Sequence, residues 1–401
     1  MVTLVDIQKA QERIGTTLHH TPLDCSRTFS GMTGQQIYLK LENLQKTGSF
    51  KLRGALNKIL SLSPEEASRG VIAASAGNHA QGVAFGATES KISSVIVMPE
   101  GAPIAKVSAT KGYGAKVVLA GKNYDEAYQR ACQIQEEEGQ TFIHAFDDPA
   151  VIAGQGTLGL EIFRELPEVA TVLVPMGGGG LAAGVAVALK ESNPRIKVIG
   201  VQAEGAPALV ESFRNHSYTT TDRAVTMADG IAVMKPGKLT YDLIQHYVDD
   251  VVTVGEAEIS RAILLLLERS KMMVEGAGAV SLAATLFSEL KFSAGPIVHV
   301  ISGGNIDVNL ISRIIERGLI ESGRRVRLSM LVPDQPGNLN RILEVIAENK
   351  ANVVQIYHSM SAQCVGIGQI EVDLVLETKD KSHAEGIVDV LGKRGFTVSF
   401  K

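Results

Sequence analysis

One lysine of the chain lies in a setting that favours nucleophilic chemistry. Lys51 has Phe50 and Leu52 as neighbours, and Gly48 and Gly54 lie close by in the sequence. Apolar neighbours indicate burial, whereas most lysines are solvated surface charges. A buried lysine loses its proton more easily, and its neutral amine can form a Schiff base with a carbonyl compound. Lys51 is therefore the first candidate for a catalytic residue.

A run of glycines forms a candidate phosphate site. The run follows the apolar segment 171–175, precedes a helix expected from Leu181, and consists of Gly177, Gly178, Gly179 and Gly180. The backbone N–H groups of such a loop are open to an anion, and the start of the helix adds a favourable dipole. The spacing matches neither the dinucleotide fingerprint nor the phosphate loop of ATP-binding proteins, so a monophosphate fits better than NAD or ATP. The alternative interpretation is a flexible turn without a ligand.

Two further turns carry polar groups where a strand is expected to lead into a helix. The first consists of Ser75, Ala76, Gly77, Asn78 and His79. Its small residues leave backbone N–H groups free to bind a carboxylate. Asn78 could hydrogen-bond a ring hydroxyl or simply cap the helix, and His79 alone would be a structural histidine. The second turn contains Ser302, which could hydrogen-bond a heterocycle nitrogen or serve as a helix cap.

The elements around these turns predict an α/β fold. Short apolar runs alternate with helix-like segments, and they lie at 71–74, 94–98, 116–119, 171–175, 198–201 and 297–301. Such alternation is typical of parallel sheets that are covered by helices on both faces. Ligands of open α/β sheets bind at the carboxyl ends of the strands, so the three turns are the first places to look for a site.

The pattern changes near residues 318–327, which we interpret as a linker because they are rich in glycine, serine and arginine. The remaining stretch, 325–401, is expected to contain four strands, near 327–332, 353–361, 367–377 and 395–400. Two helices are expected between them, near 338–349 and 381–393. The order strand, helix, strand, strand, helix, strand is that of a ferredoxin-like βαββαβ sandwich.

Length, charge and cysteine content narrow the class of protein. The 401 residues suffice for two or three domains, and 39 basic against 43 acidic residues make nucleic acid an unexpected partner. The start of the sequence does not have the pattern of a signal peptide, and the apolar run 262–267 is far too short to span a membrane. Cys25, Cys132 and Cys364 fit neither a disulfide framework nor a metal site, so we expect a cytoplasmic location.

At four motifs the sequence resembles the fold-type II pyridoxal-phosphate enzymes, and within them the threonine/serine dehydratases. The motifs, in matching order and spacing, are Ser49–Ala55, Ser75–Gly82, Gly177–Gly180 and Ser302–Asn305. The resemblance covers about residues 1–320. It implies a catalytic domain, 1–320, that is built from two open parallel-sheet α/β subdomains.

The resemblance also implies roles for single residues. Pyridoxal 5'-phosphate would be the cofactor, with Lys51 bound to it through a Schiff base and Phe50 beside it. Asn78 would bind the 3′-hydroxyl, and Ser302 would face the pyridine nitrogen. The phosphate would be held by Gly177, Gly178, Gly179, Gly180 and the backbone of Leu181. The substrate carboxylate would be bound by Ser75, Ala76, Gly77, Asn78 and His79.

The implied reaction is the dehydration and deamination of L-threonine to 2-oxobutyrate and ammonia, with L-serine as a further substrate. Isoleucine biosynthesis and threonine catabolism are both open as physiological roles. A serine-preferring dehydratase and a serine racemase are alternatives within the same class. A non-catalytic amino-acid sensor is an alternative of another class, but intact Lys51, Asn78 and Ser302 argue against it. Serine racemases of this family have a serine where Ala76 stands, so we expect elimination without racemisation.

Some enzymes similar to this chain bind a divalent cation. They use a carboxylate, a carbonyl four residues later and a second acid two residues further on. Glu204 and Ala208 fit this pattern, but Val210 does not. We therefore expect no tight metal site, although a weaker monovalent cation site near Glu204 stays open.

The segment Leu331–Leu339 resembles the opening of an ACT domain, and this resemblance covers about residues 325–401. It implies a regulatory domain that binds an amino-acid effector, with isoleucine and valine as candidates. The candidate effector-binding residues are Gly337, Asn338 and Leu339. A homodimer or homotetramer is the expected assembly. The alternative is an oligomerisation module without a ligand.

Overall fold

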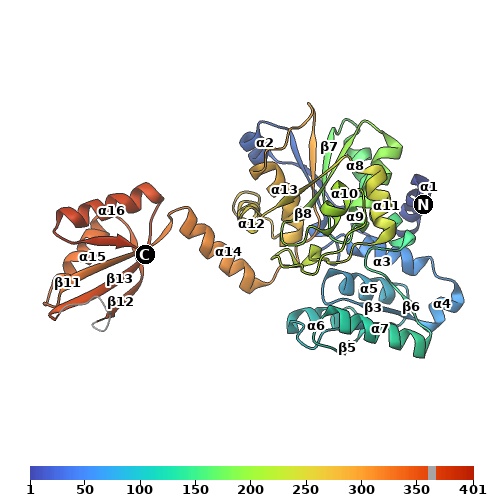
Figure 1. Ribbon diagram of the computed structural model, residues 1–401, viewed down its shortest axis with the longest axis horizontal. Helices are drawn as coiled ribbons and strands as arrows, with labels where there is room; N and C mark the ends of the chain where they lie inside the picture. Colours follow the sequence, from blue (N-terminus) through green and yellow to red (C-terminus); the bar gives the residue numbers. More distant parts are fainter. Residues whose placement is uncertain (360–366) are drawn as a thin grey trace. The chain divides into compact units, whose positions relative to one another are not determined.

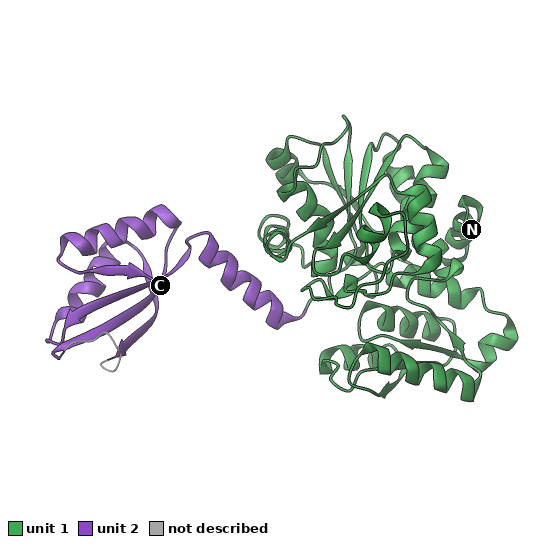
Figure 2. Cartoon of the chain, in the orientation of Figure 1, with its two compact units in different colours: residues 1–306 green, residues 307–401 purple. Residues whose placement is uncertain are grey.

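The computed structural model describes residues 1–359 and 367–401. These residues form two compact units, Met1–Ile306 and Asp307–Lys401, which Figure 2 shows in different colours. Residues 360 and 361 of the strand expected at 353–361 lie outside the described residues, as does Cys364.

The first unit contains a six-stranded sheet. Its strands, in spatial order, are β1 (Leu23–Cys25), β2 (Ile37–Leu41), β10 (Ile297–Ile301), β7 (Thr171–Pro175), β8 (Lys197–Ala203) and β9 (Asp250–Val254). All neighbours are parallel except β1 and β2. Strand β10, the last of this unit in sequence, lies between β2 and β7. The segments that follow β2, β7 and β10 therefore lie at the same edge of the sheet, although they are far apart in the sequence.

The first unit also contains a smaller sheet with four parallel strands. They are β5 (Lys116–Leu119), β4 (Ser94–Met98), β3 (Val71–Ala74) and β6 (Thr141–Phe142). Strands β3, β4, β7 and β10 are buried along their whole length, which explains their continuous apolar runs. The expected α/β fold with two parallel-sheet subdomains is confirmed, with β1 as an additional antiparallel edge.

Helices cover both sheets, and Figure 1 shows α5, α6 and α7 around the smaller one. The helices of the first unit are α1 (Leu4–Ile14), α2 (Arg27–Thr33), α3 (Lys51–Leu60), α4 (Pro64–Arg69), α5 (Asn78–Glu89), α6 (Ile104–Gly112), α7 (Tyr124–Glu138), α8 (Pro149–Glu165), α9 (Gly180–Ser192), α10 (Ala208–Arg214), α11 (Lys238–Tyr247), α12 (Glu256–Ser270) and α13 (Gly276–Phe287). Short 3-10 helices occur at η1 (Glu42–Leu44) and η2 (Asp229–Ile231). None of the helices that the structure describes combines the length and apolar character that a membrane crossing requires.

Two buried helices, α8 and α9, pack closely against each other in the core of the first unit. Small residues permit this approach. An added Cβ on Gly184 would lie 2.4 Å from the carbonyl oxygen of Ile152, and one on Gly156 would lie 2.8 Å from the carbonyl oxygen of Gly184. Helix α3 also packs against α8, so the start of α3 is held by the core of the larger sheet.

The second unit contains a four-stranded antiparallel sheet in the order β12-β13-β11-β14. Its elements are α14 (Val308–Glu321), β11 (Arg325–Pro333), α15 (Asn338–Glu348), β12 (Asn352–Ser359), β13 (Gln369–Glu377), α16 (Lys381–Lys393) and β14 (Val398–Phe400). Helices α15 and α16 contribute Ile342, Ile346 and Leu391 to one core with the sheet. The chain order and the strand order are those of a ferredoxin-like fold, as expected.

The segment 318–327, expected to be a linker, is instead mostly regular structure. Helix α14 continues to Glu321 because Leu319 and Ile320 extend its apolar spacing, and β11 begins at Arg325. The turn between them is short and includes Gly323, whose φ of 68° favours glycine. The compact units divide before α14, between Ile306 and Asp307. The assignment of 325–401 as a regulatory domain stays a prediction.

Candidate active site

A pocket of about 650 Å³ opens between the two sheets of the first unit. The turns after β3, β7 and β10 meet there, and so does the start of α3. The predicted residues that line the pocket are Phe50, Lys51, Ser75, Ala76, Gly77, Asn78, His79, Gly177, Gly178, Gly179, Gly180, Leu181 and Ser302. The fold therefore brings together every residue that the sequence suggested for cofactor and substrate binding.

Lys51 is the first residue of α3 and is partly buried in the pocket wall. Its Nζ donates a 3.1 Å hydrogen bond to the carbonyl oxygen of Ala145 and lies 5.3 Å from the centre of the Phe50 ring. Burial lowers the pKa of Lys51 to about 8, while the charge of Glu275 opposes this shift. A neutral amine is therefore accessible near neutral pH, as Schiff-base chemistry requires.

The segment before Lys51 is fixed to the turn after β10. The N–H of Phe50 donates to the carbonyl oxygen of Ser302 at 3.0 Å, and the N–H of Gly304 donates to the carbonyl oxygen of Gly48 at 2.9 Å. Ser302 is almost completely buried, with 2% of its surface exposed. These bonds hold the lysine and the candidate ring-nitrogen partner in one rigid assembly.

The glycine loop leaves no room for side chains. An added Cβ on Gly178 would lie 2.4 Å from the ring of Phe146, and one on Gly177 would lie 2.9 Å from Cα of Ile231. Gly179 caps α9 with a φ of 95°. Thr240 fixes the loop, because its Oγ1 donates to the carbonyl oxygen of Gly178 at 2.6 Å.

The first N–H groups of α9 have no partners within the helix, so the loop and the helix start together offer a binding site for a phosphate. Lys51 lines the same pocket and supplies the amine that a carbonyl group needs. The donor set therefore fits a ligand that carries both a phosphate and an aldehyde. Pyridoxal 5'-phosphate is such a molecule.

The turn after β3 is compact and lies at the start of α5. The Oγ of Ser75 accepts a 3.2 Å hydrogen bond from the N–H of Gly77. The ring of His79 is buried, and its Nε2 lies 2.8 Å from the carbonyl oxygen of Ile143. Burial, followed by the charge of Lys51, lowers the pKa of His79 to about 3, so the ring is neutral and Nε2 donates. His79 can therefore contribute only its backbone N–H to a substrate carboxylate.

The side chain of Asn78 is held between Asn305, which belongs to the motif Ser302–Asn305 but had no role assigned to it, and Glu275, which the sequence did not indicate. Its Nδ2 donates to Oε1 of Glu275 at 2.7 Å, and its Oδ1 accepts from Nδ2 of Asn305 at 2.8 Å. Glu275 has 4% of its surface exposed, and burial raises its pKa to about 7. The sequence offered only a weak signal for Glu275: it is a single carboxylate directly before helix α13, whose residues are mostly small and apolar. Phe146, Thr240 and the wall 229–237 had no recognisable signal.

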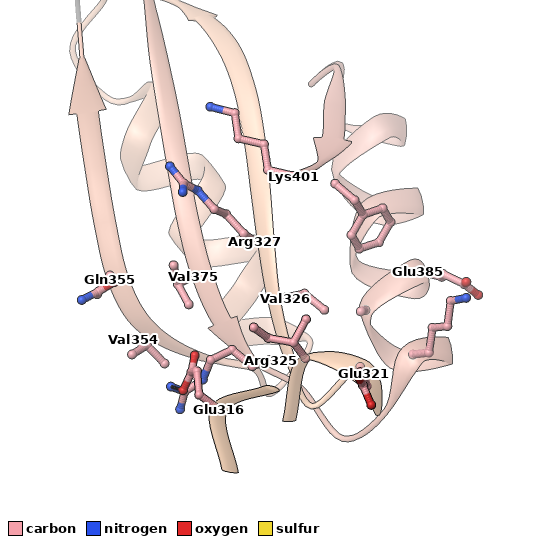
Figure 3. A pocket seen from close by; sticks show the side chains of 15 residues that line it. Glu316, Glu321, Arg325, Val326, Arg327, Val354, Gln355, Val375, Glu385 and Lys401 are labelled. Atoms are coloured by element: carbon pink, nitrogen blue, oxygen red, sulfur yellow. Dashed lines mark hydrogen bonds and ion pairs between the residues drawn. The ribbon is translucent and has the colours of Figure 1, made fainter. Parts of the chain in front are cut away.

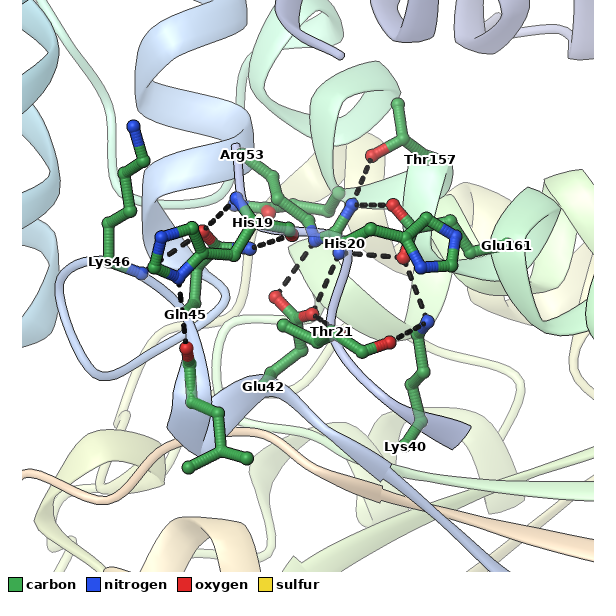
Figure 4. Close-up of polar contacts among 12 residues, drawn as sticks. His19, His20, Thr21, Lys40, Glu42, Gln45, Lys46, Arg53, Thr157 and Glu161 are labelled. Carbon is green, nitrogen blue, oxygen red and sulfur yellow. Dashed lines mark hydrogen bonds and ion pairs between the residues drawn. The ribbon is translucent and has the colours of Figure 1, made fainter. Parts of the chain in front are cut away.

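A buried ionic cluster anchors α3 two residues after Lys51 (Figure 4). The guanidinium of Arg53 binds both oxygens of Glu42 at 2.7 and 2.8 Å, and both oxygens of Glu161 at 2.6 and 2.9 Å. It also donates to Oγ1 of Thr157 at 3.1 Å. Because Glu42 and Glu161 belong to the larger subdomain, this cluster fixes the position from which Lys51 enters the pocket.

Lys40 extends the same cluster. Its Nζ lies 2.8 Å from a carboxylate oxygen of Glu161, 2.8 Å from one of Glu165 and 2.7 Å from the carbonyl oxygen of Thr21. Within the described residues, His20, Glu161 and Glu165 are close enough together to hold a metal ion. The ammonium group of Lys40 already neutralises these carboxylates, so the cluster is explained by ion pairing.

The candidate effector residues lie at the start of α15 in the second unit. Gly337 has a φ of 93° and caps the helix, and Nδ2 of Asn338 donates to the carbonyl oxygen of Pro333 at 3.0 Å. Leu339 packs against the core of this unit. They lie outside a separate pocket of about 800 Å³ in the same unit, whose lining includes Arg325, Arg327, Lys401, Glu316 and Glu385 (Figure 3).

Comparisons with known proteins agree with this geometry. Residues 14–303 match the family model described as pyridoxal-phosphate dependent enzyme. The chain is 52% identical over 398 residues to the L-threonine ammonia-lyase of Thermotoga maritima, with 99% of each chain covered. Among solved structures, the processed form of threonine deaminase isoform 2 from Solanum lycopersicum has a TM-score of 0.75 and 39% identity, covering 78% of this chain and 91% of that one. Maize serine racemase has a TM-score of 0.75 and 35% identity, covering 80% and 98%.

Proposed function

The chain belongs to the family of pyridoxal-phosphate dependent enzymes, and on this premise we propose that it removes water and then ammonia from L-threonine, yielding 2-oxobutyrate. L-Serine, which lacks only the β-methyl group, is a further substrate. The observation that carries the proposal is the partly buried amine of Lys51 in one pocket with the glycine loop, Asn78 and Ser302. The named activity of the Thermotoga maritima relative, which aligns over nearly the whole chain, supports this choice of reaction.

The pocket residues divide the chemical work. Bound pyridoxal phosphate withdraws electrons from the substrate and so makes its α-proton acidic. The Nζ of Lys51 takes that proton, because burial lowers its pKa to about 8 and so leaves a substantial fraction of the amine neutral near that pH. The bond from Cβ to the hydroxyl oxygen then breaks, and the hydroxyl group leaves with one proton, so that the net loss, counting the α-proton taken by Lys51, is one molecule of water. The enamine that is released hydrolyses to the 2-oxo acid and ammonia.

Three structural elements position the reactants for this step. The loop Gly177–Gly180 holds the phosphate, Asn78 and Ser302 orient the ring, and backbone N–H groups of the turn Ser75–His79 bind the substrate carboxylate. These contacts place the α-proton of the substrate within reach of the Nζ of Lys51.

Steady-state rates on L-threonine and L-serine test the proposed function. We expect release of 2-oxobutyrate from L-threonine and of pyruvate from L-serine, together with a visible absorption band of the bound cofactor. A cofactor-bound protein that turns over neither amino acid would instead support the alternative of a non-catalytic amino-acid sensor. Faster turnover of L-serine than of L-threonine would identify the serine-preferring alternative.

Ala76 predicts elimination without racemisation. Racemisation needs a second acid–base group on the face of the substrate opposite the lysine, and a methyl group cannot carry a proton. Ala76 lies in the substrate turn, at the position where the resemblance to serine racemases implies a serine hydroxyl. We expect negligible D-serine after incubation with L-serine and little dehydration of D-serine, both measured by chiral chromatography.

The variant Ala76→Ser provides the matching experiment. At most a trace of racemisation is expected, because an added hydroxyl still requires correct placement and a path for its proton. Substantial D-serine formed by the wild-type enzyme would contradict the prediction and favour the serine racemase alternative.

For the second unit we propose regulation by isoleucine or valine, bound near Gly337, Asn338 and Leu339, and a role in isoleucine biosynthesis. A homodimer or homotetramer is the assembly we propose. The support is the ferredoxin-like fold of this unit and the special conformation of Gly337. Maize serine racemase aligns over 98% of its own length but only 80% of this chain, which supports a catalytic body that folds without the second unit.

Deleting residues 325–401 is expected to leave turnover of L-threonine intact and to blunt the response to isoleucine or valine. Two sites must communicate for such a response, and the deletion removes one of them. Rates with and without each amino acid are the measurement. If the truncated enzyme responds as the full chain does, the effector site lies elsewhere. If neither version responds to any amino acid, the second unit serves assembly only.

A point variant of the full chain refines this experiment. Gly337→Ala forces a side chain onto a residue with a φ of 93°, so the start of α15 is distorted and the effector response weakens. Gly386→Ala is the matched control, because Gly386 lies within α16 and an added Cβ there meets nothing within 4 Å. Equal responses of the two variants would remove Gly337 from the effector site.

A further inference from the structure

A buried carboxylate faces the pocket, and among the residues that the structure describes it has no ion-pair partner within contact distance. Glu275 precedes α13, and its N–H donates to the carbonyl oxygen of Gly303 at 3.1 Å. Its side chain lines the same pocket as Lys51 and Asn78. Glu42 and Glu161, also buried, are both bound by Arg53, whereas the hydrogen bond described for the side chain of Glu275 is with the neutral amide of Asn78.

The hydrogen bonds around Asn78 determine which way its amide points. Nδ2 of Asn305 donates both to the carbonyl oxygen of Thr47 and to Oδ1 of Asn78, each at 2.8 Å. The carbonyl of Thr47 can only accept, so Asn305 must present its amino group to Asn78. Asn78 in turn must present its oxygen to Asn305 and its amino group to Glu275. One N–H of Asn78 is thereby left for a ligand in the pocket.

The position of Glu275 is sterically defined as well. An added Cβ on Gly303 would lie 2.4 Å from its Oε1, and one on Gly230 would lie 3.5 Å from the same atom. Glycine at position 303 leaves the space that the carboxyl group occupies, whereas a Cβ at position 230 would only make an ordinary van der Waals contact with it. A side chain at position 303 would therefore displace the carboxyl group of Glu275.

The charged groups that face Glu275 come from three other elements: Lys51 on α3, Lys106 on α6 and Asp229 in η2. Lys106 is itself paired with Asp229 at 2.7 Å. Burial raises the pKa of Glu275 to about 7, the hydrogen bond from Asn78 lowers it, Asp229 raises it, and the two lysines lower it. The carboxyl group therefore gains and loses its proton near neutral pH.

We propose that Glu275 is a positioning residue that holds the amide of Asn78 toward the pocket and must be uncharged when the substrate carboxylate binds at the turn Ser75–His79. The inference rests on the proposed function, because it concerns the same pocket and the same substrate. Glu275 lines the same pocket as that turn, so an ionised Glu275 would add a second negative charge to the pocket that takes the substrate carboxylate. Two like charges in a poorly hydrated site repel each other strongly.

The consequence is a distinctive pH dependence of binding. Glu275 is protonated below its pKa and ionised above it, so the binding-competent fraction falls as the pH rises through about 7. Apparent affinity falls with that fraction, and the dissociation constant therefore rises by roughly tenfold per pH unit on the alkaline side. The rate of the bound complex changes much less, because Lys51 and not Glu275 moves the α-proton.

The test measures binding and turnover of the full-length holoenzyme between pH 6 and pH 9. L-Alanine is the binding probe, since it has the amine and the carboxylate but no β-hydroxyl, and its binding changes the visible absorption of the cofactor. The variants are Glu275→Gln, which keeps an acceptor for Asn78 but cannot ionise, and Glu289→Gln. Glu289 is an exposed glutamate just beyond the other end of α13, so its substitution is the matched control.

For the wild-type enzyme and Glu289→Gln, we expect the dissociation constant of L-alanine and the KM for L-threonine to rise above pH 7. For Glu275→Gln this rise should disappear, so its affinity at pH 8.5 should exceed that of the wild type by roughly tenfold or more. The kcat values should differ much less. Titration of Lys51 and of the ligand amine affects all three proteins, so the difference between them isolates Glu275.

Identical pH profiles of the wild type and Glu275→Gln would overturn the inference. If both proteins still turned over L-threonine, the proposed function would stand. Absence of turnover and of a cofactor band in the wild type would instead refute the proposed function. If Glu275→Gln does not fold, Glu275→Asp takes its place. That variant keeps an ionisable group in a different position, so the midpoint of the pH profile should move, and an unmoved midpoint would refute the inference.

Discussion

Replacing Lys51 by alanine is expected to lower the turnover of L-threonine by at least about 10³-fold. The variant loses both the amine that exchanges with the substrate and the base that takes the α-proton. Cofactor binding should persist in weakened form, because the loop Gly177–Gly180 still offers its N–H groups to the phosphate. Borohydride treatment followed by mass spectrometry should attach the cofactor to Lys51 in the wild type and leave the variant unmodified.

Lys58→Ala is the matched control for this substitution. Lys58 lies on the same helix, α3, but its Nζ pairs with Asp148 at 2.7 Å and does not line the pocket. Turnover of this variant should stay within about twofold of the wild type, as is usual for a partly exposed pair away from the chemistry. An alanine variant at position 51 with wild-type activity would show that the Schiff-base assignment is wrong.

Replacing Arg53 by methionine is expected to lower the free energy of unfolding by about 3–5 kcal/mol. Methionine fills much of the same space, but it leaves Glu42 and Glu161 without the guanidinium that both of them contact. Each uncompensated carboxylate would then be buried. Urea unfolding followed by circular dichroism measures the change. Arg69→Met is the control, since Arg69 forms an exposed pair with Glu65 and should cost less than about 1 kcal/mol.

The difference in the free energy of unfolding between the wild type and Arg53→Met should depend on pH in a defined way. Burial alone would raise the pKa of Glu161, but the charges of Arg53 and Lys40 hold it below its ordinary value of 4.5. The stabilisation that the ionised Glu161 gives the folded state is therefore fully present above pH 4.5. It is lost as the pH falls through the lowered pKa of this residue. The difference between wild type and Arg53→Met should shrink in acid. A difference that stays constant or grows below pH 4.5 would contradict the ion-pair explanation.

The parts of the site that could be predicted from sequence are those with a local chemical signature. A lysine among apolar neighbours and four consecutive glycines each require a special environment, and the structure brings both to one pocket. The alternation of apolar runs and helices likewise predicted the parallel sheets, since buried parallel strands have no polar face. The antiparallel edge strand β1 was missed because its three residues are too few to show a pattern.

Glu275 shows why the rest of the site was not predictable. It contacts Asn78 across 197 positions in the sequence, and its unusual environment exists only after both subdomains have folded. Arg53 was visible as part of a motif, but its partners Glu42 and Glu161 lie 11 and 108 positions away. A charged residue looks the same in sequence whether it is solvated or buried, so such roles follow from the tertiary structure alone.

The central place of β10 has a consequence for the synthesis of the protein. The strand pairs with β2 and β7 on either side, yet it is the last strand of the first unit to leave the ribosome. Until then, the nascent chain exposes two unpaired apolar edges, which are prone to pair with other chains. The cofactor site is completed at the same stage, since Ser302 follows β10 directly. We therefore expect the incomplete chain to need protection by a chaperone until β10 has been synthesised. The complete cofactor site should form only after this strand has been added.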